Sequence, residues 1–405
     1  MQRSFRPTGP LMQPSSELQS GSLLRRLRDD PQDSINRIAG EIGPRRATSL
    51  AEAQTAAYID GRLRRAGLRV SAEAFRAPTG IGWDGWLTTV LAWLSALLYY
   101  WLPIPSLALA CWNLGAALVG LWRPAAPLLQ RKRPSQNVIA TRALNSVPRW
   151  RVVLLAPLDA PPASGRLARA LTAGGRLLSG RGIACGLIAL LGAGAFFGPI
   201  ELRRALWYLQ FAPACYLLLA SALELQLARA PATAGAANHA AALAALLQSV
   251  DMLAALKQTE LWAVALGAHD SGAGLADLMR RYPFDSSTMF VALESLGSGR
   301  LSYVTRDGVL PQVHADPLLL RLVAEAEAAD PLIDAEPRRY TSEPALARPL
   351  RRAGKRTLTL IGVDGDGNPA LRGSPHDTPD QVDEQALDRA IRLVVGLVKK
   401  IDEQQ

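Results

Sequence analysis

Two pairs of long apolar segments interrupt an otherwise polar chain of 405 residues. Trp86–Trp101 and Ile104–Trp122 form the first pair, separated by a proline-containing turn, and Gly182–Ile200 and Ala205–Leu223 form the second. Each segment is close to the roughly 20 residues that cross a bilayer as an α-helix. Buried core helices are the alternative, but the clustered tryptophans of the first pair are typical of a membrane interface. The sequence therefore predicts two transmembrane hairpins, at 83–122 and 182–228.

The distribution of basic residues predicts the orientation of these hairpins. An even number of spans places both chain ends and the segment between the hairpins on one side, and the other side has only Arg203 and Arg204 near the membrane. The positive-inside rule then places the polar parts in the cytoplasm, at an inner or plasma membrane. The basic residues on that side are Arg76, Arg123, Arg131, Lys132, Arg133, Arg176, Arg181 and Arg229.

The net charge of +10 comes mostly from arginine. These arginines are spread along the chain without a basic motif interleaved with aromatic residues, so we expect no nucleic-acid partner. A basic balance next to predicted membrane spans favours contact with anionic lipid instead.

The polar sequence falls into three blocks, 18–82, 123–181 and 229–405, after a tail at 1–17 whose composition predicts disorder. Strand-like apolar runs alternate with segments of helical periodicity in these blocks, which indicates an α/β sheet covered by helices. We predict one discontinuous domain, interrupted by the two hairpins. The predicted strands are Leu68–Phe75, Gln136–Thr141, Arg151–Ala156, Leu261–Leu266, Met289–Leu293 and Thr357–Ile361, and the main later helices are Ala240–Lys257, Pro317–Ala328 and Glu384–Ile401.

Short motifs in the right order across the polar blocks resemble those of the zinc-dependent aminopeptidases and carboxypeptidases of peptidase family M twenty-eight. The resemblance implies a three-layer helix/sheet/helix domain with a mostly parallel mixed sheet, into which the two hairpins are inserted. The motifs are I-G-P-R at 42–45, A-A-Y-I at 56–59, G-L-R-V at 67–70, Q-N-V-I-A at 136–140, L-L-A-P-L-D-A at 154–160, G-A-A-N-H-A-A-A at 235–242, G-A-H-D-S-G at 267–272, F-V-A-L-E-S-L-G at 290–297 and H-D-T-P-D-Q-V-D at 376–383.

Members of this family hold two zinc ions with a bridging Asp, His residues and further carboxylates, and a Glu acts as general base. Carried over to this chain, the resemblance places Pro157 at the first His position, Asn238 at the bridging Asp and Gly373 at the last His. Proline and glycine side chains offer no donor, and a neutral amide binds zinc poorly. The resemblance therefore implies that the dizinc site is lost, and we expect no cofactor.

Besides Asn238, four polar residues stand at positions that the resemblance marks as the site. Asp159 matches the orienting Asp, His269 stands at the general-base Glu, and Asp270 and Glu294 stand at two ligand positions. One hypothesis is a rearranged single-metal site of His269, Asp270, Glu294 and His376. The other is that these are ordinary polar residues at loop ends, with Asp159 capping the turn that follows its own strand.

Two functions follow from these alternatives. The first is a membrane-anchored, catalytically inactive pseudo-peptidase that keeps the family scaffold and binds a peptide or protein partner. The second is an active zinc exopeptidase of the aminopeptidase type, with displaced metal ligands. Because one fold supports many activities, the resemblance alone does not choose between them.

Overall fold

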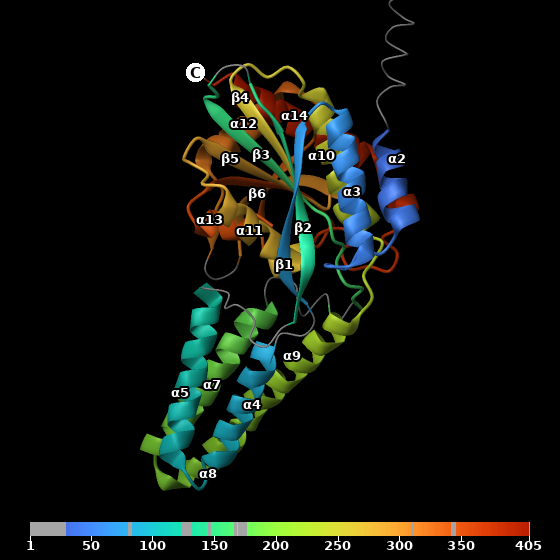
Figure 1. Ribbon diagram of the computed structural model, residues 1–405. Coiled ribbons are helices and arrows are strands. Elements are labelled where there is room, and N and C mark those ends of the chain that lie inside the picture. Colours follow the sequence, from blue (N-terminus) through green and yellow to red (C-terminus); the bar gives the residue numbers. More distant parts are fainter. Residues whose placement is uncertain are drawn as a thin grey trace, which may run out of the picture.

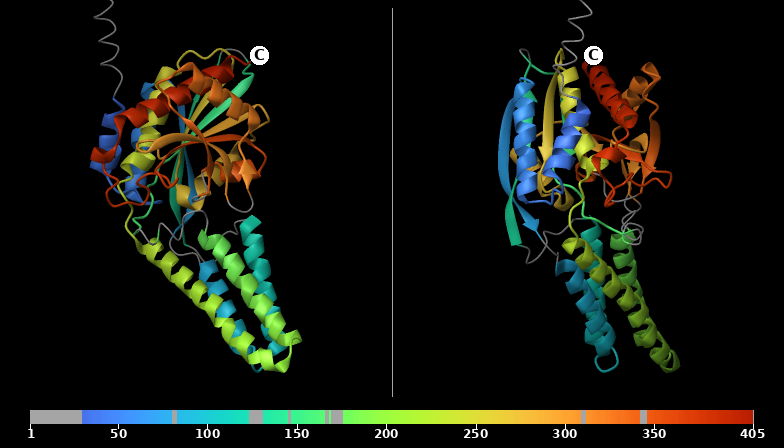
Figure 2. Two further views of the ribbon diagram at one scale, coloured as in Figure 1. Left: turned by 180° about the vertical axis from the view of Figure 1, so that it is seen from behind. Right: turned by 90° about the vertical axis from the view of Figure 1, so that its right-hand side faces the viewer.

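The computed structural model describes residues 30–79, 83–122, 131–144, 147–165, 168, 176–308, 312–341 and 346–404. These form an α/β domain from which a bundle of long helices projects at one end (Figure 1; Figure 2). The predicted tail at 1–17 lies outside the described residues.

Within the described residues, nine strands form one mixed sheet in the order β1-β2-β4-β3-β5-β9-β6-β7, and β8 pairs with β6. The four central strands β4, β3, β5 and β9 are parallel, and β1, β2 and β7 are antiparallel to their neighbours. The predicted α/β fold with a mixed sheet is confirmed. The strands are β1 (Arg69–Thr79), β2 (Arg131–Arg142), β3 (Trp150–Pro157), β4 (Thr259–Leu266), β5 (Thr288–Glu294), β6 (Arg300–Asp307), β7 (Val313–His314), β8 (Glu336–Tyr340) and β9 (Arg356–Val363).

Helices cover both faces of this sheet. The larger core lies under α2 (Pro31–Ile35), η1 (Asn36–Ile42), α3 (Leu50–Arg65), α10 (Ala241–Met252), α12 (Pro317–Ala329) and α14 (Glu384–Asp402). A second, smaller core lies under α11 (Ala273–Arg281) and α13 (Arg348–Arg352) on the opposite face. Alternate side chains of the buried strands point to opposite faces, so Val152 and Leu154 enter the first core and Val153 and Leu155 the second.

Local capping signals fix the starts of several of these helices. The Ser49 hydroxyl accepts a hydrogen bond from the backbone N–H of Glu52 at the start of α3. Asp316 and Asp383 cap α12 and α14 in the same way, each accepting from two backbone N–H groups. Such caps satisfy N–H groups that have no partner within the helix.

The bundle consists of α4 (Trp83–Leu98), α5 (Pro103–Trp122), α7 (Arg176–Phe197), α8 (Ile200–Leu209) and α9 (Phe211–Arg229). The predicted fourth span at Ala205–Leu223 is thus divided between α8 and α9. By length and composition, Gly180–Phe197 and Ile200–Arg229 suffice to cross a membrane among the described residues, and the apolar parts of α4 and α5 are shorter. Two such helices are weak evidence for a membrane location.

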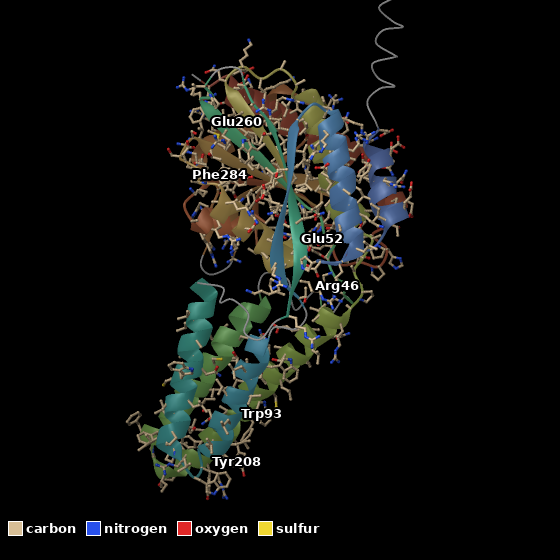
Figure 3. All side chains as sticks on the ribbon, viewed as in Figure 1. Arg46, Glu52, Trp93, Tyr208, Glu260 and Phe284 are labelled. Atoms are coloured by element: carbon tan, nitrogen blue, oxygen red, sulfur yellow. The ribbon has the colours of Figure 1, made fainter. Side chains whose placement is uncertain are left out.

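Polar side chains of the bundle face its interior. The hydroxyls of Thr89 and Ser221 lie 2.7 Å apart and join α4 to α9. Arg181 and Glu224 form an ion pair of 2.6 Å between α7 and α9. Apolar side chains instead cover the outside of the bundle, as at Tyr208, which Figure 3 labels, whereas Trp93 is half-buried against the interior of the bundle. The exposed large apolar residues include Val90, Tyr100, Trp101, Ile104, Trp112, Val119, Ile183, Leu190, Phe197, Ile200, Tyr208 and Leu219.

Candidate functional site

The candidate site lies where three parallel strands end. Asp159 follows β3, His269 and Asp270 follow β4, and Glu294 is the last residue of β5. Because the carboxyl ends of parallel strands meet at one edge of a sheet, these side chains converge. Asn238 joins them from η3 (Ala236–Ala240), the short helical turn that precedes α10.

Asp159 is fully buried and holds the turn after β4. One carboxylate oxygen accepts from the backbone N–H of His269 at 2.9 Å and the other from that of Asp270 at 3.4 Å. Burial, followed by the charges of Asp270 and Glu52, raises the pKa of Asp159 well above its usual range. The expectation that Asp159 caps the turn after its own strand is therefore wrong: both N–H groups belong to the turn after β4.

Two histidine rings pack together beside Asp159. His239 is fully buried, and its Nδ1 contacts the peptide oxygen of Asp159, so Nδ1 carries the proton that is donated. The rings of His239 and His269 meet edge to face, with centroids 5.5 Å apart. Burial, with the charge of Arg372, lowers the pKa of His269 to about 3. Burial, followed by the charges of His269 and Arg372, lowers the pKa of His239 well below its usual value. Both rings are therefore neutral at physiological pH.

Asn238 is fully buried, and both ends of its side-chain amide are bound within the protein. Its Nδ2 donates to the carboxylate of Asp377 at 2.5 Å, and its Oδ1 accepts from the hydroxyl of Ser295 at 2.6 Å. The second oxygen of Asp377 accepts from the backbone N–H of Ala237 at 2.6 Å. An amide at position 238 suits this arrangement, because a carboxylate there would face the carboxylate of Asp377.

Glu294 lies next to a cationic side chain of the same site. Its Oε1 accepts from the backbone N–H of Leu346, and its Oε2 lies 4.0 Å from the guanidinium of Arg372. Burial raises the pKa of Glu294 to about 7, although the charge of Arg372 opposes this shift. Arg372 directly precedes Gly373, the position at which the resemblance places the last zinc-binding His.

A second arginine lies beneath the site. Arg45 is fully buried and donates to the backbone oxygens of Leu158 (3.2 Å), Gly43 (3.0 Å) and Ala234 (2.8 Å). Burial lowers its pKa to about 10, and the charges of Asp159 and Asp377 act against that shift. Arg45 therefore stays cationic, and its charge offsets those of the buried carboxylates of Asp159 and Asp377.

Backbone strain is concentrated at the same place. Three of the five described non-glycine residues with left-handed backbone conformations lie here: Ala268 (φ 46°), Ser295 (φ 50°) and Leu371 (φ 58°). Each is a direct neighbour of a site residue, namely His269, Glu294 and Arg372. Strained conformations persist where the surrounding structure enforces them, and they gather at functional sites.

No family model and no curated protein matches the sequence. Solved structures do match. A zinc aminopeptidase from Bacillus subtilis is 12% identical, with 91% of this chain and 93% of that chain covered and a TM-score of 0.52. A leucine aminopeptidase precursor from Bacteroides thetaiotaomicron is 14% identical (93% and 97% covered, TM-score 0.53). A glutaminyl cyclase from Fimbriiglobus ruber is 13% identical (93% and 96% covered, TM-score 0.53).

The chain has the zinc-aminopeptidase fold. At these identities the similarity establishes the fold alone.

The donors present in this zinc-aminopeptidase fold do not fit a pair of zinc ions. The carboxylate of Asp159 is bound by two backbone N–H groups, the amide of Asn238 is bound at both ends, and Pro157 has no donor. Across the described ranges, no group of three or more His, Cys, Asp or Glu side chains is placed to hold a metal ion. His376 is exposed, and its neighbour Asp377 points into the site instead.

The structure brings Asp159, Asn238, His269, Asp270 and Glu294 together, but His376 stays at the surface. Reasoning from the sequence missed Arg45, Asp377 and Arg372 as members of this site. Arg45 and Asp377 lie inside the I-G-P-R and H-D-T-P-D motifs, which were interpreted only as markers of the fold. Arg372 lies in no motif, and its position next to Gly373, the residue at the last His position, was its only sequence signal.

Proposed function

We propose that this protein is a membrane-anchored pseudo-peptidase that binds a peptide or protein partner at the candidate site. The main observation behind this proposal is that both ends of the Asn238 side-chain amide are hydrogen-bonded within the protein. Its amide is shared between Asp377 and Ser295, so the position that bridges metals in the resembling family serves an internal network here. Arg372 adds a positive charge next to Glu294, which opposes the binding of a second cation.

The membrane part of the proposal is supported by the surface of the bundle. Large apolar side chains are exposed along α4, α5, α7 and α9, while polar groups such as Thr89 and Ser221 are buried between helices. An exposed apolar surface of this extent marks an interaction site. The basic residues at the domain end of the bundle support a cytoplasmic location of the α/β domain by the positive-inside rule.

Binding at this site is supported by its mixture of buried and accessible groups. Asp270 is exposed and His269 is half-buried, whereas Asp159 and Glu294 beneath them are buried. A peptide that reaches this edge of the sheet meets a carboxylate, a neutral imidazole and the Arg372 guanidinium. The site offers charge and hydrogen-bond recognition without a metal-bound water.

Peptide capture tests this proposal. The full-length protein in detergent micelles is mixed with a combinatorial hexapeptide mixture, and retained peptides are identified by mass spectrometry. We expect a selected subset to be retained, and Asp270→Ala to remove this selection. The matched control is His314→Ala, since His314 is exposed on β7 and pairs with Arg306 of β6 at the far end of the strand order. Retention of no subset, or of the same subset by Asp270→Ala, would contradict binding at this site.

A second candidate is an active zinc exopeptidase that uses His269, Asp270, Glu294 and His376. The fold of its structural neighbours favours this candidate. Turnover of aminoacyl chromogenic substrates with added zinc or cobalt tests it. Robust turnover that Asp270→Ala abolishes would establish this candidate in place of the pseudo-peptidase.

A further inference from the structure

The two-stranded ribbon of β1 and β2 extends beyond the rest of the sheet toward the bundle (Figure 1; Figure 2). β2 pairs with β4 only over 138–142, whereas residues 131–137 pair with β1 alone. The projecting end flanks the first helical hairpin in the sequence: β1 ends at Thr79 and α4 begins at Trp83, and α5 ends at Trp122 before β2 begins at Arg131. Residues 76–79 and 131–134, which we call the ribbon end, therefore lie where the bundle meets the α/β domain.

Basic side chains occupy both faces of the ribbon end. Arg76, Arg131, Lys132 and Arg133 are all exposed. Cross-strand partners share a face, and the register pairs Arg133 with Ala77 and Arg76 with Pro134. Arg131 and Arg133 therefore lie on one face, and Lys132 and Arg76 on the other.

Carboxylates of the described residues form no ion pair with these charges. Nearby acidic residues already have partners: Glu73 pairs with Arg281 at 2.9 Å, and Glu224 pairs with Arg181 at 2.6 Å. Among the residues that the structure describes, no ion pair joins a basic side chain of the ribbon end to a carboxylate. The ribbon end is thus a concentrated positive charge beside an apolar bundle.

We propose that the ribbon end binds the headgroups of anionic phospholipids at the membrane surface. The proposal rests on the membrane anchoring proposed above, which sets the ribbon end at the level of the headgroups. Clusters of Lys and Arg next to membrane helices attract anionic lipid within a short distance of the surface. Because the basic side chains point from both faces, the ribbon end contacts headgroups on two sides.

The same ribbon also contacts the turn after β4, which belongs to the candidate site. Ser135 donates to the carboxylate of Glu52 at 3.1 Å, and the other oxygen of Glu52 accepts from the backbone N–H of Ala268 at 2.7 Å. Asn137 accepts from the backbone N–H of Gly267 at 3.0 Å. Figure 3 shows Glu52 at the end of the domain that faces the bundle. Lipid binding at the ribbon end therefore orders the turn that bears His269 and Asp270.

The contact between ribbon and turn is too close for a side chain at Gly267. A Cβ there would lie 2.3 Å from the peptide oxygen of Gln136 and 2.5 Å from Oγ of Ser135. Phe75 and Ala77 of the ribbon pack against Ala268 in one small cluster. The ribbon and the turn are thus held together by backbone contact as well as by hydrogen bonds, so a restraint on one restrains the other.

Reconstitution of the full chain tests the proposal. Wild type and the triple variant Arg131→Gln/Lys132→Gln/Arg133→Gln are placed in nanodiscs of phosphatidylcholine, with or without about one third phosphatidylglycerol. Retained lipid is measured by native mass spectrometry, and amide exchange is measured at 267–272. The matched control neutralises Arg65, Arg69 and Lys399, which are exposed; Arg69 lies at the opposite end of β1.

We expect wild type and the control to retain phosphatidylglycerol, and its presence to slow exchange at 267–272 roughly fivefold. The ribbon variant should lose both effects. Equal retention by the ribbon variant, or no preference of wild type for phosphatidylglycerol, would overturn the proposal. Extraction with sodium carbonate tests membrane anchoring separately from lipid binding. A protein that carbonate removes from phosphatidylglycerol vesicles binds the lipid but is not anchored in the membrane.

Discussion

Asn238 and Asp377 are joined by a hydrogen bond of 2.5 Å, in which the side-chain amide of one donates to the carboxylate of the other. Both residues are fully buried, and Ser295 completes the network from the opposite side of the amide. A carboxylate at position 238 bridges metals in the family that this chain resembles. Here the position is fitted to a neighbouring carboxylate, which makes the asparagine part of the fold.

Restoring the family residue should therefore destabilise the protein. Asn238→Asp places two carboxylates in contact without water, which should lower the free energy of unfolding by about 2–4 kcal/mol at neutral pH. The loss should shrink at pH 5, where one of the two carboxyl groups takes up a proton. Denaturant unfolding of the purified protein at both pH values measures this.

The control for this prediction exchanges the two groups. Asn238→Asp/Asp377→Asn keeps one amide and one carboxylate in contact, so it should recover a large part of the lost stability. Equal destabilisation of the single and double variants would contradict the account of the network.

Asp159 should control the order of the turn after β4. Asp159→Ala removes the acceptor for the backbone N–H groups of His269 and Asp270, so amide exchange at 267–272 should become about tenfold faster. Hydrogen exchange with mass spectrometry measures this. Asp316→Ala removes a comparable cap from α12 and should leave exchange at 267–272 unchanged. Unaltered exchange in Asp159→Ala would show that the turn stays ordered without this carboxylate.

Glu294 should make the protein less stable as the pH rises. Its pKa of about 7 in the folded state exceeds the ordinary value of 4.5, so the folded state binds the proton more tightly than the unfolded state. The stability from this proton is present below about pH 4.5 and is lost as the pH rises through about 7. Glu294→Gln keeps the acceptor for Leu346 and should flatten this dependence, gaining roughly 2–3 kcal/mol at pH 8. An equally steep decline of the variant's stability with rising pH would contradict the assignment of this effect to Glu294.

Arg45 should contribute far more stability than its neighbour in sequence. Arg45→Ala leaves several buried backbone oxygens without a donor and removes a charge that offsets Asp159 and Asp377, so we expect a loss of about 3–5 kcal/mol. Arg46 is exposed and donates to the backbone oxygen of Ala230, the residue that follows α9. Figure 3 labels Arg46 beside the end of this helix. Arg46→Ala should cost about 1 kcal/mol or less. Similar losses in the two variants would contradict the role of Arg45.

The fold was predictable because it depends on local pattern. Apolar runs such as Leu261–Leu266 became β4, and the apolar positions of α14 face the larger core as their spacing predicted. β6, β7 and β8 were missed: β7 has only two residues, and exposed arginines such as Arg300 and Arg339 interrupt the apolar pattern of the other two strands.

The site was predictable only in part, because its members are brought together by the tertiary fold. Asp159 and Glu294 follow recognisable strands, so their convergence was expected from the sequence. Arg372 lies in a turn whose path depends on the left-handed backbone at Leu371, a leucine that gives no sequence signal for that conformation. The partner of Asn238 was likewise hidden, since Asp377 lies 139 positions away.

Metal stoichiometry tests the central claim most directly. The protein is purified in detergent at neutral pH, supplied with zinc, exchanged into zinc-free buffer and weighed by native mass spectrometry. Asp270→Ala serves as the matched variant, since Asp270 is the exposed carboxylate of the site. The account predicts no stoichiometric zinc in either protein. One or two zinc ions per wild-type chain, lost in Asp270→Ala, would contradict it.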